Sequence, residues 1–183
     1  LWNRKTNKIF KIMIRVLQVR GGMNRRGEES FIMNVYRKID RTRVQFDFLV
    51  YTDEKQDFEE EIESLGGRVI HMPCETGIKA FLSIPKFRRI ILEMGPYKVI
   101  HIQTLLNSAW PLLAVPKGCG VVRMVHSHNT HNKSVMSGVE RVYEIFAKYI
   151  IRTHTQVMAA CGEEAGEYLF GQKFRKGGIV LNN

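Results

Sequence analysis

The stretch VLQVRGGMNRRGEESFIMNVY, residues Val16–Tyr36, predicts a buried strand joined to an amphipathic helix by a basic loop that contains glycine. The apolar run stops at Gly21-Gly22, and from Gly27 onward apolar residues return at the i, i+3, i+4 spacing of a helix. A strand, a tight turn and a helix in this order form the opening unit of an α/β sheet with parallel strands.

The remainder of the chain repeats this alternation and predicts a single domain. Strands are expected over residues 11–19, 44–51, 68–73, 97–103, 120–128, 153–161 and 177–183. Helices are expected over residues 27–39, 55–67, 84–94, 108–117, 138–152 and 162–171. We therefore predict a Rossmann-like parallel sheet flanked by helices on both faces, preceded by a flexible basic leader over residues 1–11.

The loop at residues 20–27 lies where an open parallel sheet binds ligands, beyond the carboxyl end of a strand. Glycines let backbone N–H groups approach an anion, and the following helix adds its positive dipole end. The dinucleotide fingerprint would need a glycine at Met23, and Glu28-Glu29 replace the Lys-Ser/Thr pair of a P-loop. A nicotinamide enzyme and a P-loop NTPase are therefore disfavoured.

The net charge of +10 is concentrated near the amino terminus. Residues 1–43 contain 12 Lys/Arg and 3 Asp/Glu, whereas residues 44–183 contain 16 and 15. This distribution suits an anionic partner such as nucleic acid, anionic lipid or a phosphorylated substrate, and it also suits a solubilising face with a basic tail. RNP-like aromatic motifs, zinc fingers and a convincing helix-turn-helix are missing, which disfavours nucleic acid.

Cysteine usage and hydropathy indicate a cytoplasmic setting. The three cysteines form no CxxC pair, so neither a disulfide framework nor a zinc site is suggested. No apolar run approaches the ~18 residues of a membrane span, and residues 1–11 are too polar for a signal peptide. A peripheral contact with the inner face of the membrane remains a hypothesis for residues 81–94, where basic residues separate apolar ones, beside the alternative of an ordinary surface helix.

Five segments together carry a resemblance to a known family: RVLQVRGGMNRRGEESFIMNVYRKIDRTRVQFDFLVY, EIESLGGRVIHMP, YKVIHIQTLLNS, HSHNT and ACGEEAGEYLFG. In this order they resemble the amino-terminal domain of a family-four glycosyltransferase of GT-B architecture, of the kind that builds bacterial exopolysaccharide or capsule. The resemblance implies a retaining, metal-independent enzyme without a cofactor. It further implies that such an enzyme transfers a sugar from a nucleotide-sugar donor to a glycan or lipid-linked glycan acceptor.

The resemblance also implies which domain this chain is. Residues 12–183 match the acceptor-side Rossmann-like domain, while the carboxy-terminal domain that binds the nucleotide sugar is absent from the chain. That second domain supplies the Arg/Lys pair and the carboxylate that stabilise the departing diphosphate. The chain alone is therefore expected to be inactive.

Site residues follow from the same resemblance. It implies that Gly21 and Gly22 approach the diphosphate and sugar of the donor and that His128 is the catalytic histidine lining the sugar site. The residues expected to bind the acceptor are Asn24, Arg25 and His126. Two further residues, Arg26 and Glu29, are expected to lie in the cleft. Arg26 replaces a family glycine and Glu28 a small residue, and both changes alter how the loop meets a phosphate.

Two alternatives remain beside this assignment. The cluster of His126, His128 and His131 has residue types that bind metals, but no carboxylate lies close by in the sequence, so we expect no metal. A non-catalytic sugar-binding module is the other reading of the whole chain, ahead of a basic nucleic-acid-binding domain.

Overall fold

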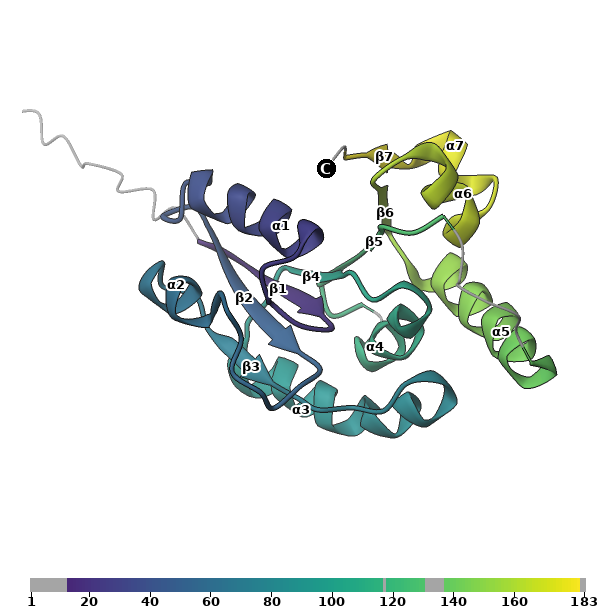
Figure 1. The fold of residues 1–183 in the computed structure, drawn as a ribbon, viewed down its shortest axis with the longest axis horizontal. Helices are drawn as coiled ribbons and strands as arrows, with labels where there is room; N and C mark the ends of the chain where they lie inside the picture. The colour runs from purple at the N-terminus through teal and green to yellow at the C-terminus, as the bar shows by residue number, and fades with distance from the viewer. Residues whose placement is uncertain (1–12, 117, 131–136, 182–183) are drawn as a thin grey trace, which may run out of the picture.

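The chain forms one parallel sheet covered by helices on both faces, as predicted (Figure 1). The structure, a computed structural model, describes residues 13–116, 118–130 and 137–181, so the expected leader and His131 lie outside the described residues. The strands are β1 (Ile14–Arg20), β2 (Val44–Val50), β3 (Val69–His71), β4 (Val99–Ile102), β5 (Val122–Ser127), β6 (Val157–Ala160) and β7 (Ile179–Val180).

The strand order is β3-β2-β1-β4-β5-β6-β7, with every pair parallel. β1 is the turning point of this order, because the chain moves from β1 to one edge through β2 and β3 and then returns to the other side at β4. Such a reversal leaves a crevice at the carboxyl ends of the two central strands.

The helices are α1 (Gly27–Lys38), α2 (Glu59–Ser64), α3 (Ile84–Met94), α4 (Ala109–Ala114), α5 (Gly138–His154), α6 (Glu163–Phe170) and α7 (Lys173–Gly177). Two 3₁₀ turns, η1 (Gly77–Ser83) and η2 (Leu105–Ser108), precede α3 and α4. The α1 and α2 helices cover one face of β1 and β2, and α3, α4 and α5 cover the opposite face (Figure 1).

Several expected boundaries differ from the observed ones. The helix expected over residues 108–117 is observed as α4, which follows η2 directly, and it ends early because Val115, before Pro116, is extended. The helix expected over residues 55–67 is shortened to α2, and Gly66 follows it with a φ of 85°. Neither η1 nor α7 was predicted.

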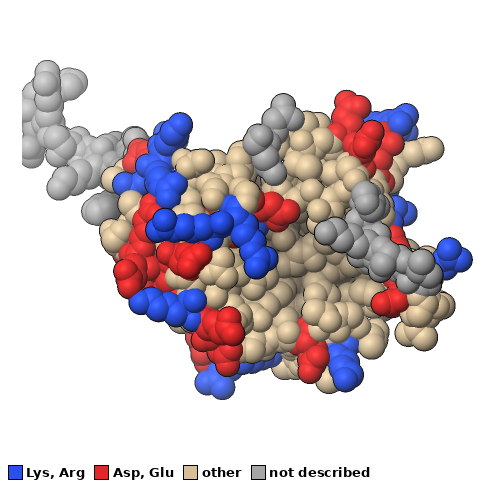
Figure 2. All heavy atoms as spheres, viewed as in Figure 1, with Lys and Arg blue, Asp and Glu red and all other residues tan. Residues whose placement is uncertain are grey.

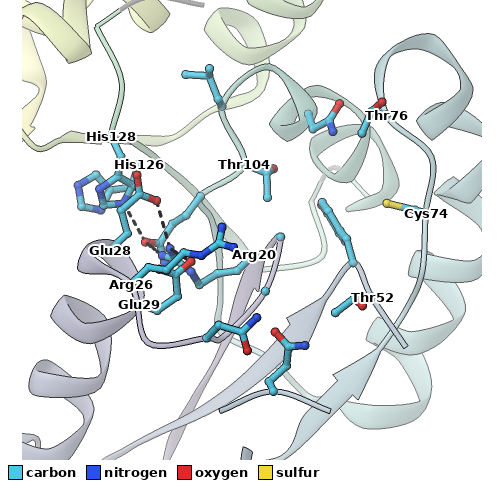
Figure 3. A pocket seen from close by; sticks show the side chains of 18 of the residues that line it. Arg20, Arg26, Glu28, Glu29, Thr52, Cys74, Thr76, Thr104, His126 and His128 are labelled. Carbon is cyan, nitrogen blue, oxygen red and sulfur yellow. Dashed lines mark hydrogen bonds and ion pairs between the residues drawn. The ribbon is translucent and has the colours of Figure 1, made fainter. Parts of the chain in front are cut away.

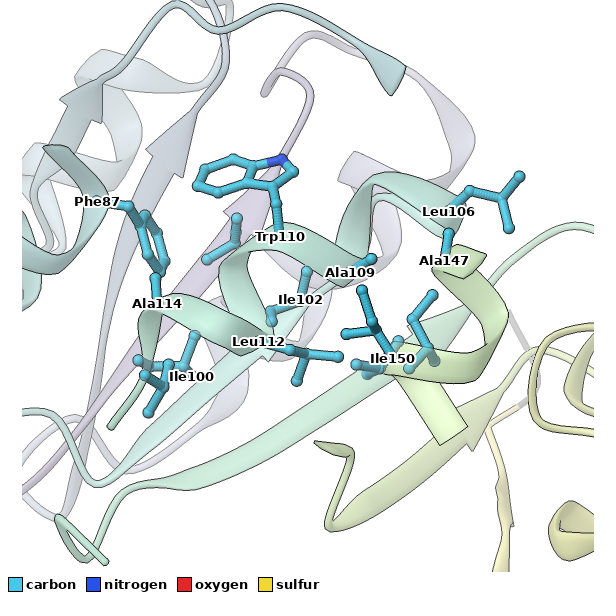
Figure 4. Packing of buried hydrophobic residues seen from close by; sticks show 14 of the residues in the cluster. Phe87, Ile100, Ile102, Leu106, Ala109, Trp110, Leu112, Ala114, Ala147 and Ile150 are labelled. Atoms are coloured by element: carbon cyan, nitrogen blue, oxygen red, sulfur yellow. The ribbon is translucent and has the colours of Figure 1, made fainter. Parts of the chain in front are cut away.

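The larger core lies under α3, α4 and α5, and Trp110 is at its centre (Figure 4). The Trp110 ring packs edge-on against Phe87 of α3 at 5.3 Å and lies 5.4 Å from the ring of Tyr51. Burying a side chain such as Phe87 stabilises the fold by about 1.5–3 kcal/mol. This core fixes the loop after β4, and with it one wall of the crevice.

A second, polar cluster is buried within the sheet around Asp47 of β2, which is fully buried. Its carboxylate accepts hydrogen bonds from Arg15 at 2.6 Å, from Arg68 at 2.5 Å and from the Tyr97 hydroxyl at 3.0 Å. Burial alone would raise the pKa of Asp47, but the hydrogen bonds and charges of Arg68 and Arg15 hold it below its usual value.

Among the described residues, no helix combines the length and the apolar character needed to cross a bilayer. The apolar side of α3 packs inward, since Phe87 is fully buried and Ile91 is 8% exposed. Within residues 81–94, which motivated a membrane contact, Phe87 and Ile91 therefore belong to the core, whereas Leu82 and Leu92 are exposed.

Candidate functional site

A cavity of about 550 Å³ opens at the carboxyl ends of β1, β2, β4 and β5, at the turning point of the strand order (Figure 3). Its lining comes from five separate connections: the loop from β1 to α1, the residues after β2, those after β3, the turn after β4, and the segment after β5. The topology thus assembles one site from residues that lie far apart along the chain.

The floor of the cavity is formed by Arg20, the last residue of β1, whose side chain is 2% exposed. Its Nη1 donates to Gln103 Oε1 at 2.7 Å, and its Nη2 lies 3.2 Å from Glu28 and 3.3 Å from Glu29. Its Nε is buried and has no hydrogen-bond partner among the residues described. A buried guanidinium needs such carboxylate partners, because an unpaired charge out of water is strongly unfavourable.

Glu28 and Glu29 lie in the first turn of α1, where carboxylates also interact favourably with the helix dipole. Burial raises the pKa of Glu28, and the charge of Arg20 opposes that rise. The positive end of α1 therefore faces the protein's own carboxylates. Counting Arg26 and Glu54 as well, the lining carries two cations and three carboxylates and has no positive excess for an anion.

Three histidines form a stack beside Arg20. The rings of His101 and His126 are parallel with centroids 5.7 Å apart, and those of His126 and His128 are 4.0 Å apart. Burial and the nearby Arg20 lower the pKa of His126 to about 4, and burial, His126 and Arg20 lower that of His128 to about 3. Burial likewise lowers the pKa of His101. All three imidazoles are consequently neutral at physiological pH.

The opposite wall is uncharged and rich in hydroxyl groups (Figure 3). It consists of Tyr51, Thr52, Thr76, Thr104 and Asn107, with Cys74 among them. Sugars present the same kinds of group, hydroxyl donors and acceptors around an apolar ring, so this wall is chemically suited to one.

The cavity brings together most of the site residues that the sequence predicts. The expected residues that line it are Gly21, Gly22, Asn24, Arg26, Glu29, His126 and His128. Arg25 is the exception. Its backbone N–H donates to Asp57 at 3.0 Å and its guanidinium lies over the Phe58 ring at 5.8 Å, and it is not part of the lining.

Gly22 has a definite structural task. A Cβ at this position would lie 2.8 Å from Oε1 of Gln56, the atom that accepts the Met23 N–H at 2.7 Å. Around Gly21, by contrast, a Cβ would meet no atom within 4 Å. The lack of a side chain at Gly22 thus lets the loop pack closely against Gln56, whereas the space beside Gly21 is open at the cavity.

Arg20, Gln103 and the hydroxyl wall were missed as site residues, although the sequence contains a signal for the first two. Three strands that become neighbours in the sheet place polar residues two apart at their carboxyl ends: Gln18 and Arg20, His101 and Gln103, His126 and His128. Alternate residues of a strand share one face. Three such pairs indicate a continuous polar face at one end of a sheet that is otherwise apolar.

Within the described part of the chain, no three His, Cys, Asp or Glu side chains are grouped in a way that could hold a metal ion. Charged side chains on the face shown in Figure 2 gather over α1 and α2, with both signs interspersed, and the centre of that face is largely uncharged.

Comparison with known proteins places this geometry in context. The family model described as a glycosyl transferase 4-like domain matches residues 26–182. EpsF of Bacillus subtilis (strain 168), a protein named as a glycosyltransferase, is 39% identical over 158 residues, which cover 86% of this chain and 41% of EpsF. The chain therefore spans about two fifths of the length of this relative.

A solved structure described as an alpha-glucosyltransferase in complex with UDP-glucose and DNA containing an abasic site has the same fold. The TM-score is 0.50 at 11% sequence identity, and the match covers 93% of this chain and 42% of the other.

Proposed function

The chain belongs to the glycosyl transferase 4-like family, and from this premise we propose that it is the acceptor-side half of an enzyme that transfers a sugar from a nucleotide-sugar donor to a glycan. The family confirms the resemblance stated from the sequence, and the glucosyltransferase structure has the same fold. In this proposal the donor domain follows the chain, and the product is an exopolysaccharide or capsule.

The observation that carries the proposal is the cavity at the turning point of the sheet, with a charged floor and a hydroxyl-rich wall. Since its lining lacks a positive excess, we assign it to an uncharged sugar and not to the diphosphate. The diphosphate would then be stabilised by the second domain, while backbone groups at Gly21 and Gly22 approach it from this side.

His128 is proposed to contact the transferred sugar. With a pKa near 3 the imidazole is neutral at physiological pH, so it acts through hydrogen bonding and not as a cation or a proton donor. Asn24, Arg26, Glu29 and His126 would orient the acceptor from the same cavity. Catalysis then rests on positioning, without a metal or a cofactor in the proposed mechanism, and with retention of configuration.

The decisive experiment uses the full-length product of the gene. It is incubated with UDP-, GDP- and ADP-sugars and a membrane extract from the source, and nucleotide release and label transfer are followed. UDP-sugars come first, because the structural relative holds UDP-glucose. Transfer from one donor supports the proposal. Glycan binding without transfer from any donor would favour the sugar-binding module instead.

Replacing His128 by alanine in that assay should lower turnover about 100-fold or more if its contact orients the reacting sugar. His154, at the end of α5 and outside the cavity lining, supplies the matched control: His154→Ala should leave turnover within about twofold. Near-normal turnover of the His128 variant would contradict the proposed contact with the reacting sugar.

A contact with the inner face of the membrane, where a lipid-linked acceptor would lie, is also proposed. Exposed apolar side chains of η1 and α5 support it, at positions Ile78, Leu82, Val142, Ile145 and Tyr149. In a flotation assay the protein should rise with vesicles that contain anionic lipid, and Leu82→Glu should lower the fraction of protein that floats with them. Equal recovery with neutral and anionic vesicles would argue against it.

A further inference from the structure

Gln103 connects the charged floor of the cavity to the histidine stack. It follows β4, is 7% exposed, and makes three hydrogen bonds through its amide. Its Oε1 accepts from Arg20 Nη1 at 2.7 Å and lies 3.1 Å from His128 Nε2, while its Nε2 donates to Gln18 Oε1 at 3.0 Å.

These contacts determine which atom of each group carries a proton. Arginine has only donors, so the amide atom of Gln103 that faces Arg20 must be the oxygen. The same oxygen faces His128 Nε2 and cannot donate to it, so Nε2 must hold the imidazole proton. A neutral imidazole has one ring proton, and Nδ1 of His128 therefore has the lone pair. The low pKa of His128 supports the neutral form.

We propose that Gln103 is a positioning residue that holds His128 in the Nε2–H tautomer, so that Nδ1 can only accept a hydrogen bond. Arg20 is part of the device, because its guanidinium fixes the orientation of the Gln103 amide. Glu28 and Glu29 hold Arg20 in turn, so the beginning of α1 and the histidine after β5 share one network.

The consequence for substrate recognition rests on the function proposed above. A ring nitrogen that only accepts will select a hydroxyl that donates, and it cannot stabilise charge developing on a sugar oxygen by donating a proton. His128 would then orient a sugar hydroxyl.

The tautomer is directly measurable in full-length protein labelled with ¹⁵N-histidine. Two-bond ¹H–¹⁵N correlations distinguish Nε2–H from Nδ1–H, and a His128→Asn variant identifies the signals of His128 by their loss. The wild-type spectrum should show the Nε2–H form. A predominant Nδ1–H form, or a mixture, would overturn the proposal.

Two variants of Gln103 test its role. Gln103→Met keeps the side-chain length but removes the acceptor, and it should give a mixture of tautomers. Gln103→Glu still accepts from Arg20 and His128, so it should retain the Nε2–H form. The matched control is Gln45→Met, because Gln45 is another buried glutamine and is hydrogen-bonded to Tyr36 and Leu65 outside the cavity lining. This control variant should leave the tautomer of His128 unchanged. An unchanged spectrum for Gln103→Met would refute the assignment, and if that variant does not fold, loss of the Nε2–H form in Gln103→Glu would do so.

Turnover provides the functional readout in the same full-length protein. Gln103→Met should lower kcat about tenfold with a smaller effect on KM, and Gln103→Glu should recover part of the loss. The two proposals fail separately: an Nε2–H tautomer in a protein without transferase activity leaves the positioning intact, whereas a wrong tautomer in an active enzyme removes only the positioning.

Discussion

Replacing Arg20 by methionine removes the positive charge between Glu28 and Glu29 on the cavity floor. Removing one partner of a fully buried pair costs about 3–5 kcal/mol, because the other charge stays buried and unpaired. Here the remaining carboxylates are partly hydrated, with side chains 37% exposed for Glu28 and 14% for Glu29. Solvent screening therefore lowers the expected loss in the free energy of unfolding to about 2 kcal/mol near neutral pH.

The loss should depend on pH with a definite sign. Burial already raises the pKa of Glu28, and the charge of Arg20 counteracts this effect. Without Arg20 that pKa rises further, and a carboxyl whose folded pKa is raised destabilises the fold above that value and ceases to do so once it is protonated. The difference between variant and wild type should therefore shrink as the pH falls from neutral to about 5.

Urea unfolding followed by far-ultraviolet circular dichroism measures both effects on the same samples. Arg37→Met is the control, since it breaks an ion pair with Glu61 in which both side chains are more than a third exposed, and it should cost less than about 1 kcal/mol. A deficit in the Arg20 variant as small as that of the control, or one that is constant with pH, would refute the reasoning.

Three further substitutions test buried contacts in the fold. Asp47→Asn should lower the free energy of unfolding by about 2–3 kcal/mol, because the buried carboxylate is shared by Arg15, Arg68 and Tyr97. The pKa of Asp47 is lowered in the folded protein, so the extra stability of the wild type is fully present above the pKa that Asp47 has in the unfolded chain. This extra stability should disappear as the pH falls through the pKa of Asp47 in the folded protein, and urea unfolding at a series of acidic pH values measures the loss. Gly22→Ala should lower the free energy of unfolding by about 1–2 kcal/mol, because the new Cβ displaces Gln56 from the Met23 N–H. Gly21→Ala should lower it by less than about 0.5 kcal/mol, since a Cβ there meets no atom. Thermal unfolding compares the two variants, and equal losses of stability would contradict the contact assigned to Gly22.

Local patterns were enough to predict the alternation of strands and helices. The observed α3 has the bounds expected for residues 84–94, since a proline near its start and a regular apolar stripe define it locally. The 3₁₀ turn before it was missed because its side chains have no single period, and α7 because a five-residue helix between glycines carries too little pattern. Helix formation there is decided by packing, with Phe174 buried against α6.

The sequence predicts the site residues that form a local motif, but it does not identify residues that reach the cavity only through the pairing of distant strands. The histidines after β5 and the glycines after β1 stand out in the sequence, and the structure gathers both at one cavity. Arg20 looks like an ordinary charge at the end of a strand. Its burial follows from the pairing of β1 with β4 and from the return of α1 over the strand end, neither of which a local pattern shows.

The bond between Arg20 and Gln103 also has a kinetic consequence, because it joins residues 83 positions apart. β2 and β3 lie between them along the chain, so β1 and β4 meet only after a long loop has closed, and contacts of this kind form slowly. We therefore expect the cavity floor to be assembled late in folding. A ligand that occupies the cavity stabilises only chains in which the central strands have paired, and its binding reports completed folding.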